Sequence, residues 1–170
     1  AQKLLAQGKH DESAALRAKA FDAAPATPGE ADGKVFDWIA DADMRLGPVL
    51  EVIINGRYFW MPFSQIRSLE LDEPADLRDR VWMAGTITLV NGGELVALVP
   101  TRYPESTEAD PEAMMARATD WQDIGANTYI GIGQRLLTIG DQDIAIMDLR
   151  SLRLHGAEDT DEPQGGLTDG

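Results

Sequence analysis

Glu51–Trp60, with the sequence EVIINGRYFW, is the stretch that decides the fold. Both of its arms are rich in β-branched and aromatic residues, which favour strands. Asn55 and Gly56 lie between the arms and supply the two positive-φ positions of a type I′ turn. The stretch therefore predicts a β-hairpin in which Val52 pairs with Phe59.

The pairing across this hairpin divides its side chains between two faces. Because side chains alternate along a strand, Val52 and Phe59 are expected to face the core. Glu51, Tyr58 and Trp60 share the opposite face, where the carboxylate argues for a wet surface because a dry core would not tolerate it. A wet aromatic patch on a sheet is a recognition surface. Tyr58, Trp60 and Glu51 are therefore our candidate partner-binding residues.

Short elements are predicted on both sides of the hairpin. Apolar residues at helical spacing indicate a helix over residues 35–42, which Gly47-Pro48 ends. Turn and capping signals predict a strand at 64–71, a capped turn or short helix at 74–80, a second hairpin at 85–90 and 94–99, a helix opened by Asp110-Pro111 through 119, and strands at 129–139 and 143–149. This order predicts an α+β fold with a largely antiparallel sheet or a small barrel.

The two hairpins are expected to lie in one sheet and to share one core. The residues predicted to point into that core are Val52, Phe59, Ile87, Leu89 and Val99. If Phe59 is buried there, its truncation to alanine is expected to cost about 3–5 kcal/mol.

The first 25 residues are similar to part of a tetratricopeptide repeat. Residues 1–7 look like the end of a helix, Gly8 fits a tight turn, and a second helix extends to Pro25. Leu16, Ala20 and Phe21 fall on one face of that helix and need a partner to cover them. A half-repeat is not stable alone, so a longer helical array is expected. We predict a helical remnant at 1–25, a linker at 26–33, an α+β domain at 34–155 and an acidic, flexible tail at 156–170.

Composition narrows the function classes. The chain has no cysteine, which removes disulfides and thiolate chemistry. Its apolar runs are too short for a membrane helix, and it opens with no secretory signal, so a cytoplasmic location is expected. The formal net charge of −14 opposes nucleic-acid binding. Five acidic residues lie in the last fifteen, without a basic one, so part of this charge belongs to the tail.

The sharpest catalytic candidate is the acidic segment of the predicted helix. Asp37 and Asp41 would share a face there, where they could hold Mg²⁺ or act as acid and base. The ordinary interpretation is a solvated helix face with Asp43 and Arg45 at its end, since no second ligand cluster accompanies the pair. We therefore predict no metal site, and we expect Asp41 to be a surface charge.

Other motifs carry weaker signals. Gly131-Ile132-Gly133 lacks the third glycine of a dinucleotide fingerprint, so we interpret both glycines as marks of a bulge or a close backbone approach in a strand. The two histidines, His10 and His155, are poorly placed for a catalytic triad. The arginines at 78, 80 and 102, together with Tyr103, are expected to tie loops to the sheet, with binding of a partner's carboxylates as the alternative.

The four tryptophans, at 38, 60, 82 and 121, have two possible roles. Tryptophan anchors either cores or interfaces. Burial in the core is the ordinary expectation for each, and Trp60, on the wet hairpin face with Tyr58, is the exception.

The series from Phe36 to Pro104 resembles the C-terminal domain of the ImpE/SciE/TagJ family. The resemblance is carried by FDWIADADMRLGP (36–48), the first hairpin followed by MPF, PADLRDRVW (74–82), the Asn-Gly-Gly turn at 91–93 and PTRYP (100–104). It extends from about Glu12 to about Leu149. Family members carry a further helical region that is mostly absent here.

This resemblance implies a non-enzymatic adaptor of bacterial type VI secretion systems. The partners it implies are the small subunit of the contractile sheath, bound through its N-terminal helix, and the AAA+ ATPase of the ClpV type that recycles the sheath. It implies no cofactor and no catalytic residue, while the composition of the chain predicts neither a nucleic-acid nor a membrane partner. The alternative from the residues is a small metal-dependent hydrolase that uses the acidic helix around Asp37 and Asp41.

Overall fold

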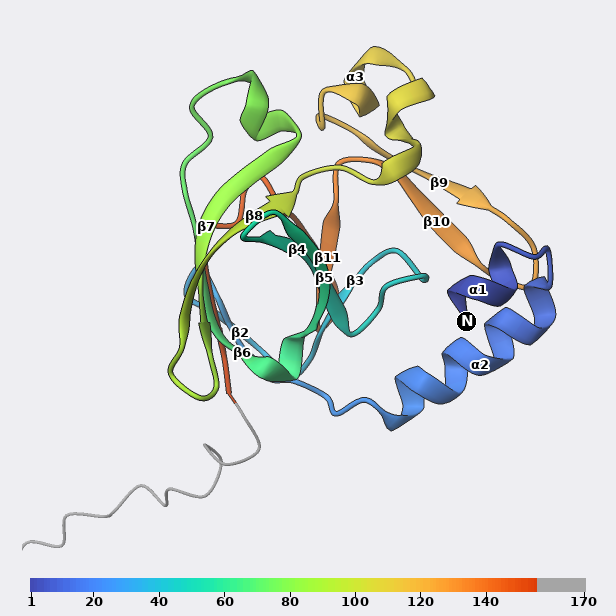
Figure 1. Ribbon diagram of the computed structural model, residues 1–170, viewed down its shortest axis with the longest axis horizontal. Helices are drawn as coiled ribbons and strands as arrows, with labels where there is room; N and C mark the ends of the chain where they lie inside the picture. The colour runs from blue at the N-terminus through green and yellow to red at the C-terminus, as the bar shows by residue number, and fades with distance from the viewer. Residues whose placement is uncertain (156–170) are drawn as a thin grey trace, which may run out of the picture.

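One large antiparallel sheet is the main element of the fold. The structure is a computed structural model that describes residues 1–155, and Figure 1 shows it as a ribbon. The sheet has the strand order β2-β1-β13-β6-β7-β8-β4-β5. Its strands are β1 (Gly29–Ala31), β2 (Lys34–Phe36), β4 (Val49–Ile54), β5 (Arg57–Pro62), β6 (Ile66–Leu71), β7 (Trp82–Leu89), β8 (Glu94–Pro100) and β13 (Ser151–Leu154).

Two small sheets and several short helices complete the described part of the chain. The second sheet has the order β12-β11-β3, from β3 (Ile39–Asp41), β11 (Leu136–Ile139) and β12 (Gln142–Ala145). The third pairs β9 (Thr119–Asp123) with β10 (Tyr129–Gly133). The helices are α1 (Gln2–Leu5), α2 (His10–Ala23), α3 (Pro111–Met114) and the 3₁₀ turns η1 (Phe63–Gln65), η2 (Leu77–Arg80) and η3 (Pro104–Glu108). The predicted α+β fold with a largely antiparallel sheet is confirmed.

Both predicted hairpins are confirmed, and they lie in the same sheet. β4 and β5 pair in the predicted register, with Val52 opposite Phe59, and β7 and β8 form the second hairpin. Val52, Ile87 and Val99 are buried in one core, and Leu89 packs against it half-buried. The turn sequence was sufficient to predict the strand pairing, because an Asn-Gly turn and the alternation of side chains determine the register of a short hairpin.

The predicted burial of Phe59 is wrong. Its ring lies on the core side of the sheet, opposite Val52, but it is 39% exposed. The reason is that β5 is an edge strand of the large sheet, so no further strand covers it. The guanidinium of Arg57 covers part of the ring instead, at 5.8 Å from its centroid. Truncating Phe59 should therefore cost much less than a core cavity would.

The predicted helix over residues 35–42 is also wrong. Residues 34–36 form β2 and residues 39–41 form β3, with a bend between them. The two strands find hydrogen-bond partners in β1 and β11, respectively. A window of eight residues fits both helical spacing and two short strands, and distant partners decided between them. Two smaller differences are that α3 ends at Met114, well short of 119, and that β9 was not predicted.

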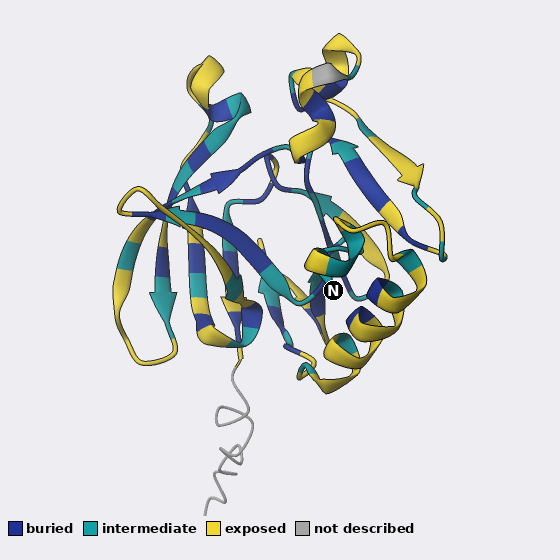
Figure 2. Cartoon of the chain, turned by 45° about the vertical axis from the view of Figure 1, so that its right-hand side comes forward, coloured by how far each residue is buried: buried dark blue, intermediate teal, exposed yellow. Residues whose placement is uncertain are grey.

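The N-terminal residues form the expected pair of helices. Gly8, with φ of +73°, makes the turn between α1 and α2. Leu16 is half-exposed, and Figure 2 shows that one side of α2 faces solvent while the other faces the β-sheets. Arg17 on the inner side is buried and donates to Thr128 Oγ1 at 2.6 Å. The predicted linker at 26–33 contains strand β1, which pairs with β13, and the predicted tail at 156–170 lies outside the described residues.

Candidate functional site

A buried arginine holds two carboxylates between the sheets. Arg135 follows β10, and its side chain is 0% exposed. Its Nη1 donates to Asp41 at the end of β3, its Nη2 donates to Glu51 in β4, and its Nε donates to the Pro100 carbonyl at 3.0 Å. Asp41 and Glu51 are also buried. One cation therefore ties together β3, β4 and β8, all of which lie far from it in the sequence.

Tyr103 completes this buried cluster. Its hydroxyl donates to Asp41 Oδ1 at 3.0 Å and accepts from the backbone N–H of Leu136 at 3.1 Å. The Arg135 guanidinium lies over its ring, 5.0 Å from the centroid. The ring packs so closely on Gly131 that a Cβ there would come within 2.1 Å of it. The predicted close backbone approach at Gly131 is therefore confirmed.

A third buried carboxylate, that of Asp43, lies beside the cluster. It accepts hydrogen bonds from Arg45 Nη2, at 2.7 Å, and from the backbone N–H of Gly131, at 2.9 Å. Arg45 also contacts Glu105 at 2.6 Å. Asp43 therefore ties the loop after β3 to β10, and it does not cap a helix.

The structure contradicts the hypothesis of an acidic helix that carries Asp37 and Asp41 on one face. Asp37 lies exposed in the bend between β2 and β3, whereas Asp41 is buried and paired with Arg135. The two carboxylates do not share a helix face, because no helix forms there. Within residues 1–155, no group of three or more acidic or histidine side chains is arranged to hold a metal ion. The prediction that Asp41 is a solvated surface charge is also wrong.

Burial sets the protonation behaviour of the cluster. Loss of water raises the pKa of Asp41 to about 6, and the charge of Arg135 opposes this rise. Burial, with a smaller contribution from the charge of Asp41, raises the pKa of Tyr103 above its ordinary value. Burial and its hydrogen bond to Glu51 raise the pKa of Tyr58 to about 12. Both phenols therefore stay protonated and act as hydrogen-bond donors.

We predict that Asp41 makes stability depend on pH between about 4 and 6. The folded state keeps the proton of Asp41 up to a pH of about 6, whereas the unfolded chain releases it near its ordinary pKa of about 3.9. The unfolded chain thus binds fewer protons in this window, and the free energy of unfolding should fall as pH rises through it. Urea unfolding of the wild type and Asp41→Asn at several pH values measures this slope. Identical slopes for both proteins would contradict the assignment.

The candidate residues on the first hairpin divide into exposed and buried. Tyr58 is 56% exposed and Trp60 is 42% exposed, as predicted. Glu51 is buried, contrary to prediction, because Arg135 reaches across and neutralises it. Trp60 Nε1 donates to the Tyr58 hydroxyl, which donates to Glu51. Two exposed aromatic rings are thus tied by hydrogen bonds to the buried cluster.

A cavity of about 400 Å³ opens beside Tyr58. Glu51 and Tyr58 line one side of it, and Trp82, Arg102 and Tyr103 are among the residues around the rest. Tyr58 therefore lies at a cavity, and Trp60 is connected to it through the hydrogen bond to the Tyr58 hydroxyl. Such an arrangement suits the binding of a protruding side chain.

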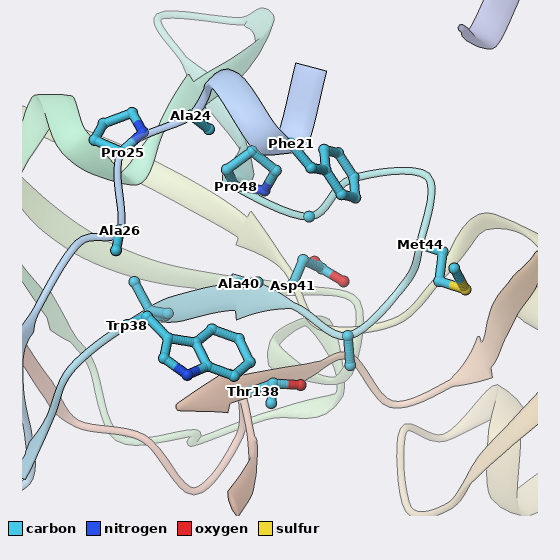
Figure 3. A pocket seen from close by; sticks show the side chains of 13 residues that line it. Phe21, Ala24, Pro25, Ala26, Trp38, Ala40, Asp41, Met44, Pro48 and Thr138 are labelled. Atoms are coloured by element: carbon cyan, nitrogen blue, oxygen red, sulfur yellow. The ribbon is translucent and has the colours of Figure 1, made fainter. Parts of the chain in front are cut away.

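The remaining tryptophans are less buried than expected. Trp38 and Trp121 are each about 40% exposed, and Trp82 is half-buried. Trp38 lies at a second cavity, of about 490 Å³, between the end of α2 and β3. Figure 3 shows this cavity, with Trp38 and Thr138 on one side and Phe21 and Pro48 on the other. The interior placement of Trp38 and Trp121 is thus corrected.

Arg135 and Tyr103 are the central residues that sequence reasoning missed or misjudged. Arg135 was not singled out, although a lone arginine between the apolar runs YIGIG and LLTIG is an unusual pattern for a buried strand. Tyr103 was expected, like Arg102, to tie a loop to the sheet or to bind a partner's carboxylates. Arg102 does tie a loop, since its Nη1 donates to the Met114 carbonyl. Arg78 pairs with Asp76 and Asp79 in its own loop.

Comparisons with known proteins agree with this fold. The chain is 51% identical over 148 residues to the type VI secretion system accessory component TagJ of Pseudomonas aeruginosa. The aligned residues make up 86% of this chain and 51% of that protein. The crystal structure of a protein from Vibrio parahaemolyticus superposes with a TM-score of 0.83 and 24% identity, over 89% of this chain and 57% of that one. The chain thus spans about half the length of these relatives.

No helix within residues 1–155 has the length and apolar character that a membrane span requires.

Residues 33–153 match the family described as ImpE protein. The matched residues include all the strands from β2 to β12 and most of β13. This chain therefore belongs to the ImpE family.

Proposed function

We propose that this chain is part of a type VI secretion accessory component that acts by binding other proteins and not by catalysis. The name of its Pseudomonas aeruginosa relative supports the secretion role. The chemistry of the buried cluster supports the binding role, because Arg135 neutralises the carboxylates of Asp41 and Glu51 inside the protein. A catalytic carboxylate would need to be free to exchange a proton with a substrate, whereas both of these are engaged by Arg135 and Asp41 also accepts from Tyr103.

The partners we propose are the small subunit of the contractile sheath, through its N-terminal helix, and the AAA+ ATPase of the ClpV type. Both would be met in the cytoplasm. The single observation that carries a binding role is the exposed pair Tyr58 and Trp60, held in place by Glu51 and Arg135. Rigid aromatic side chains provide a large contact area at a low entropic cost, which is typical of interface hot spots. Capture of either purified partner by the immobilised chain tests this proposal.

We predict that the double variant Tyr58→Ala, Trp60→Ala keeps its fold and loses at least about tenfold in affinity for one partner, which equals about 1.4 kcal/mol. Both rings are largely exposed, so their loss leaves no core cavity. Calorimetric titration with each partner measures the loss, and circular dichroism checks the fold. Val96→Ala on strand β8 of the same sheet is a control, since Val96 is an exposed apolar residue that does not line the cavity. Unchanged affinity for both partners would remove this surface from the proposal.

A further inference from the structure

The cavity beside Trp38 is an apolar groove with a floor of small residues. In β3, Ile39 and Asp41 point inward and are buried, so Ala40 between them points to the opposite face. Ala40 pairs with Thr138 of β11, and both line the groove. We call this feature the Trp38 groove, with Ala40, Ala42 and Thr138 as its floor and Trp38, Phe21 and Met44 as its large side chains.

The two sides of the Trp38 groove come from different parts of the fold. One side is the end of α2 and the proline-containing segment after it, and the other is β3 with Trp38 (Figure 3). Phe21 is held against the loop after β3, because Gly47 lacks a side chain there. A Cβ on Gly47 would lie 2.3 Å from the Phe21 ring. The helical remnant is thus packed firmly enough to form a fixed side of the groove.

Among the charged residues next to the groove, Arg45 is paired with Asp43 and Glu105, and those without an ion pair are acidic. The groove's only charged lining residue is Asp41, whose carboxylate is paired with Arg135 in the interior. Asp37 and Asp22 are exposed next to Trp38 and Phe21 in the sequence, and Asp143 accepts a hydrogen bond from Thr138 of the floor at 2.7 Å. These three carboxylates form no ion pair with any residue in 1–155. An apolar floor with unneutralised carboxylates around it complements a segment that is both apolar and basic.

We propose that the Trp38 groove binds an amphipathic, basic segment of a partner protein. Apolar side chains of that segment lie on Ala40, Ala42 and Thr138, and lysine or arginine side chains reach Asp22, Asp37 and Asp143. This inference deepens the proposed function, on which it rests for the identity of the partner, and it assigns a surface separate from Tyr58 and Trp60. A small polar ligand fits less well, since the lining offers few polar groups to orient it.

The test uses overlapping 15-residue peptides from the sheath small subunit and the ATPase of the same secretion system, titrated into the chain. Peptides that carry both apolar residues and net positive charge should bind, and the indole signal of Trp38, assigned with Trp38→Phe, should shift in NMR spectra. Ala40→Phe fills the floor and should weaken this binding at least about tenfold. Ala15→Phe, at an exposed position of α2, is the matched control and should bind like the wild type.

Charge reversal provides the second, independent variant. Asp22→Lys with Asp37→Lys should weaken the binding of the basic peptides at least about tenfold without changing the floor. Asp72→Lys with Asp148→Lys, at positions that are also exposed, should leave this binding unchanged.

If the whole partners bind but neither Ala40→Phe nor this reversal weakens the binding of any peptide, the groove is overturned and the proposed function stands. If neither whole partner binds, the proposed function fails. The groove is then tested with two designed amphipathic peptides that share the same leucine face. One carries lysine and the other carries glutamate on the opposite face, and only the lysine peptide should bind. Equal binding of both, or none, would overturn it.

Discussion

Replacing Arg135 with methionine is expected to lower the free energy of unfolding by about 3–5 kcal/mol, as breaking a buried ion pair usually does. The substitution keeps most of the side-chain volume but leaves Asp41 and Glu51 buried without their cation. It also leaves the Pro100 carbonyl without its donor. Urea unfolding followed by tryptophan fluorescence measures the change.

Two controls distinguish the charge from the volume. Arg117→Met removes an exposed arginine that pairs only with Glu112, and it should change stability by less than about 0.5 kcal/mol. Combining Arg135→Met with Asp41→Asn and Glu51→Gln should recover much of the loss, because the buried charges are then absent. A fully stable Arg135→Met protein would show that the cluster contributes little to the fold.

Replacing Gly131 with alanine should destabilise the protein by about 1–3 kcal/mol or more through overpacking. The added methyl group would lie 2.1 Å from the ring of Tyr103. That ring cannot move freely, since Tyr103 is buried and its hydroxyl bonds both Asp41 and Leu136. Thermal unfolding of the variant measures the effect.

A second substitution tests whether Tyr103 is the cause. In a Tyr103→Leu background, which is itself less stable, Gly131→Ala should cost much less, so the double variant should be more stable than the sum of single effects predicts. Gly93→Ala is the matched control, because Gly93 is exposed in a turn and its nearest neighbour would be the flexible side chain of Asn91, at 3.2 Å. Purely additive effects at positions 131 and 103 would contradict the packing argument.

Local sequence signals predicted the two hairpins and the family correctly. The register of β4 and β5 followed from Asn55-Gly56, and the turn at 91–93 predicted β7 and β8. Such turns restrict the backbone over a few residues, so their effect does not depend on distant partners. The start of α3 after its N-cap Asp110 was predictable for the same reason, since the Asp110 carboxylate accepts hydrogen bonds from the N–H groups of residues 112 and 113.

The segment around β2 and β3 shows where local signals fail. Its apolar spacing predicted a helix, yet β1 and β11 supplied strand partners. That single difference also overturned the acidic helix, because Asp37 became exposed and Asp41 became buried. A short apolar pattern is compatible with both structures, and the neighbours that decide between them come from elsewhere in the chain.

By itself, the sequence of this protein determined its hairpins, its α+β class and the exposure of Tyr58 and Trp60, because turn residues and the alternation of side chains act over a few positions. Only the tertiary structure decided that Arg135 pairs with Asp41 and Glu51, which lie 94 and 84 residues away along the chain. It also decided that α2 and β3 form the two sides of the Trp38 groove. The packing of distant segments decides which groups neutralise a charge and which line a groove, and local sequence patterns do not predict such contacts.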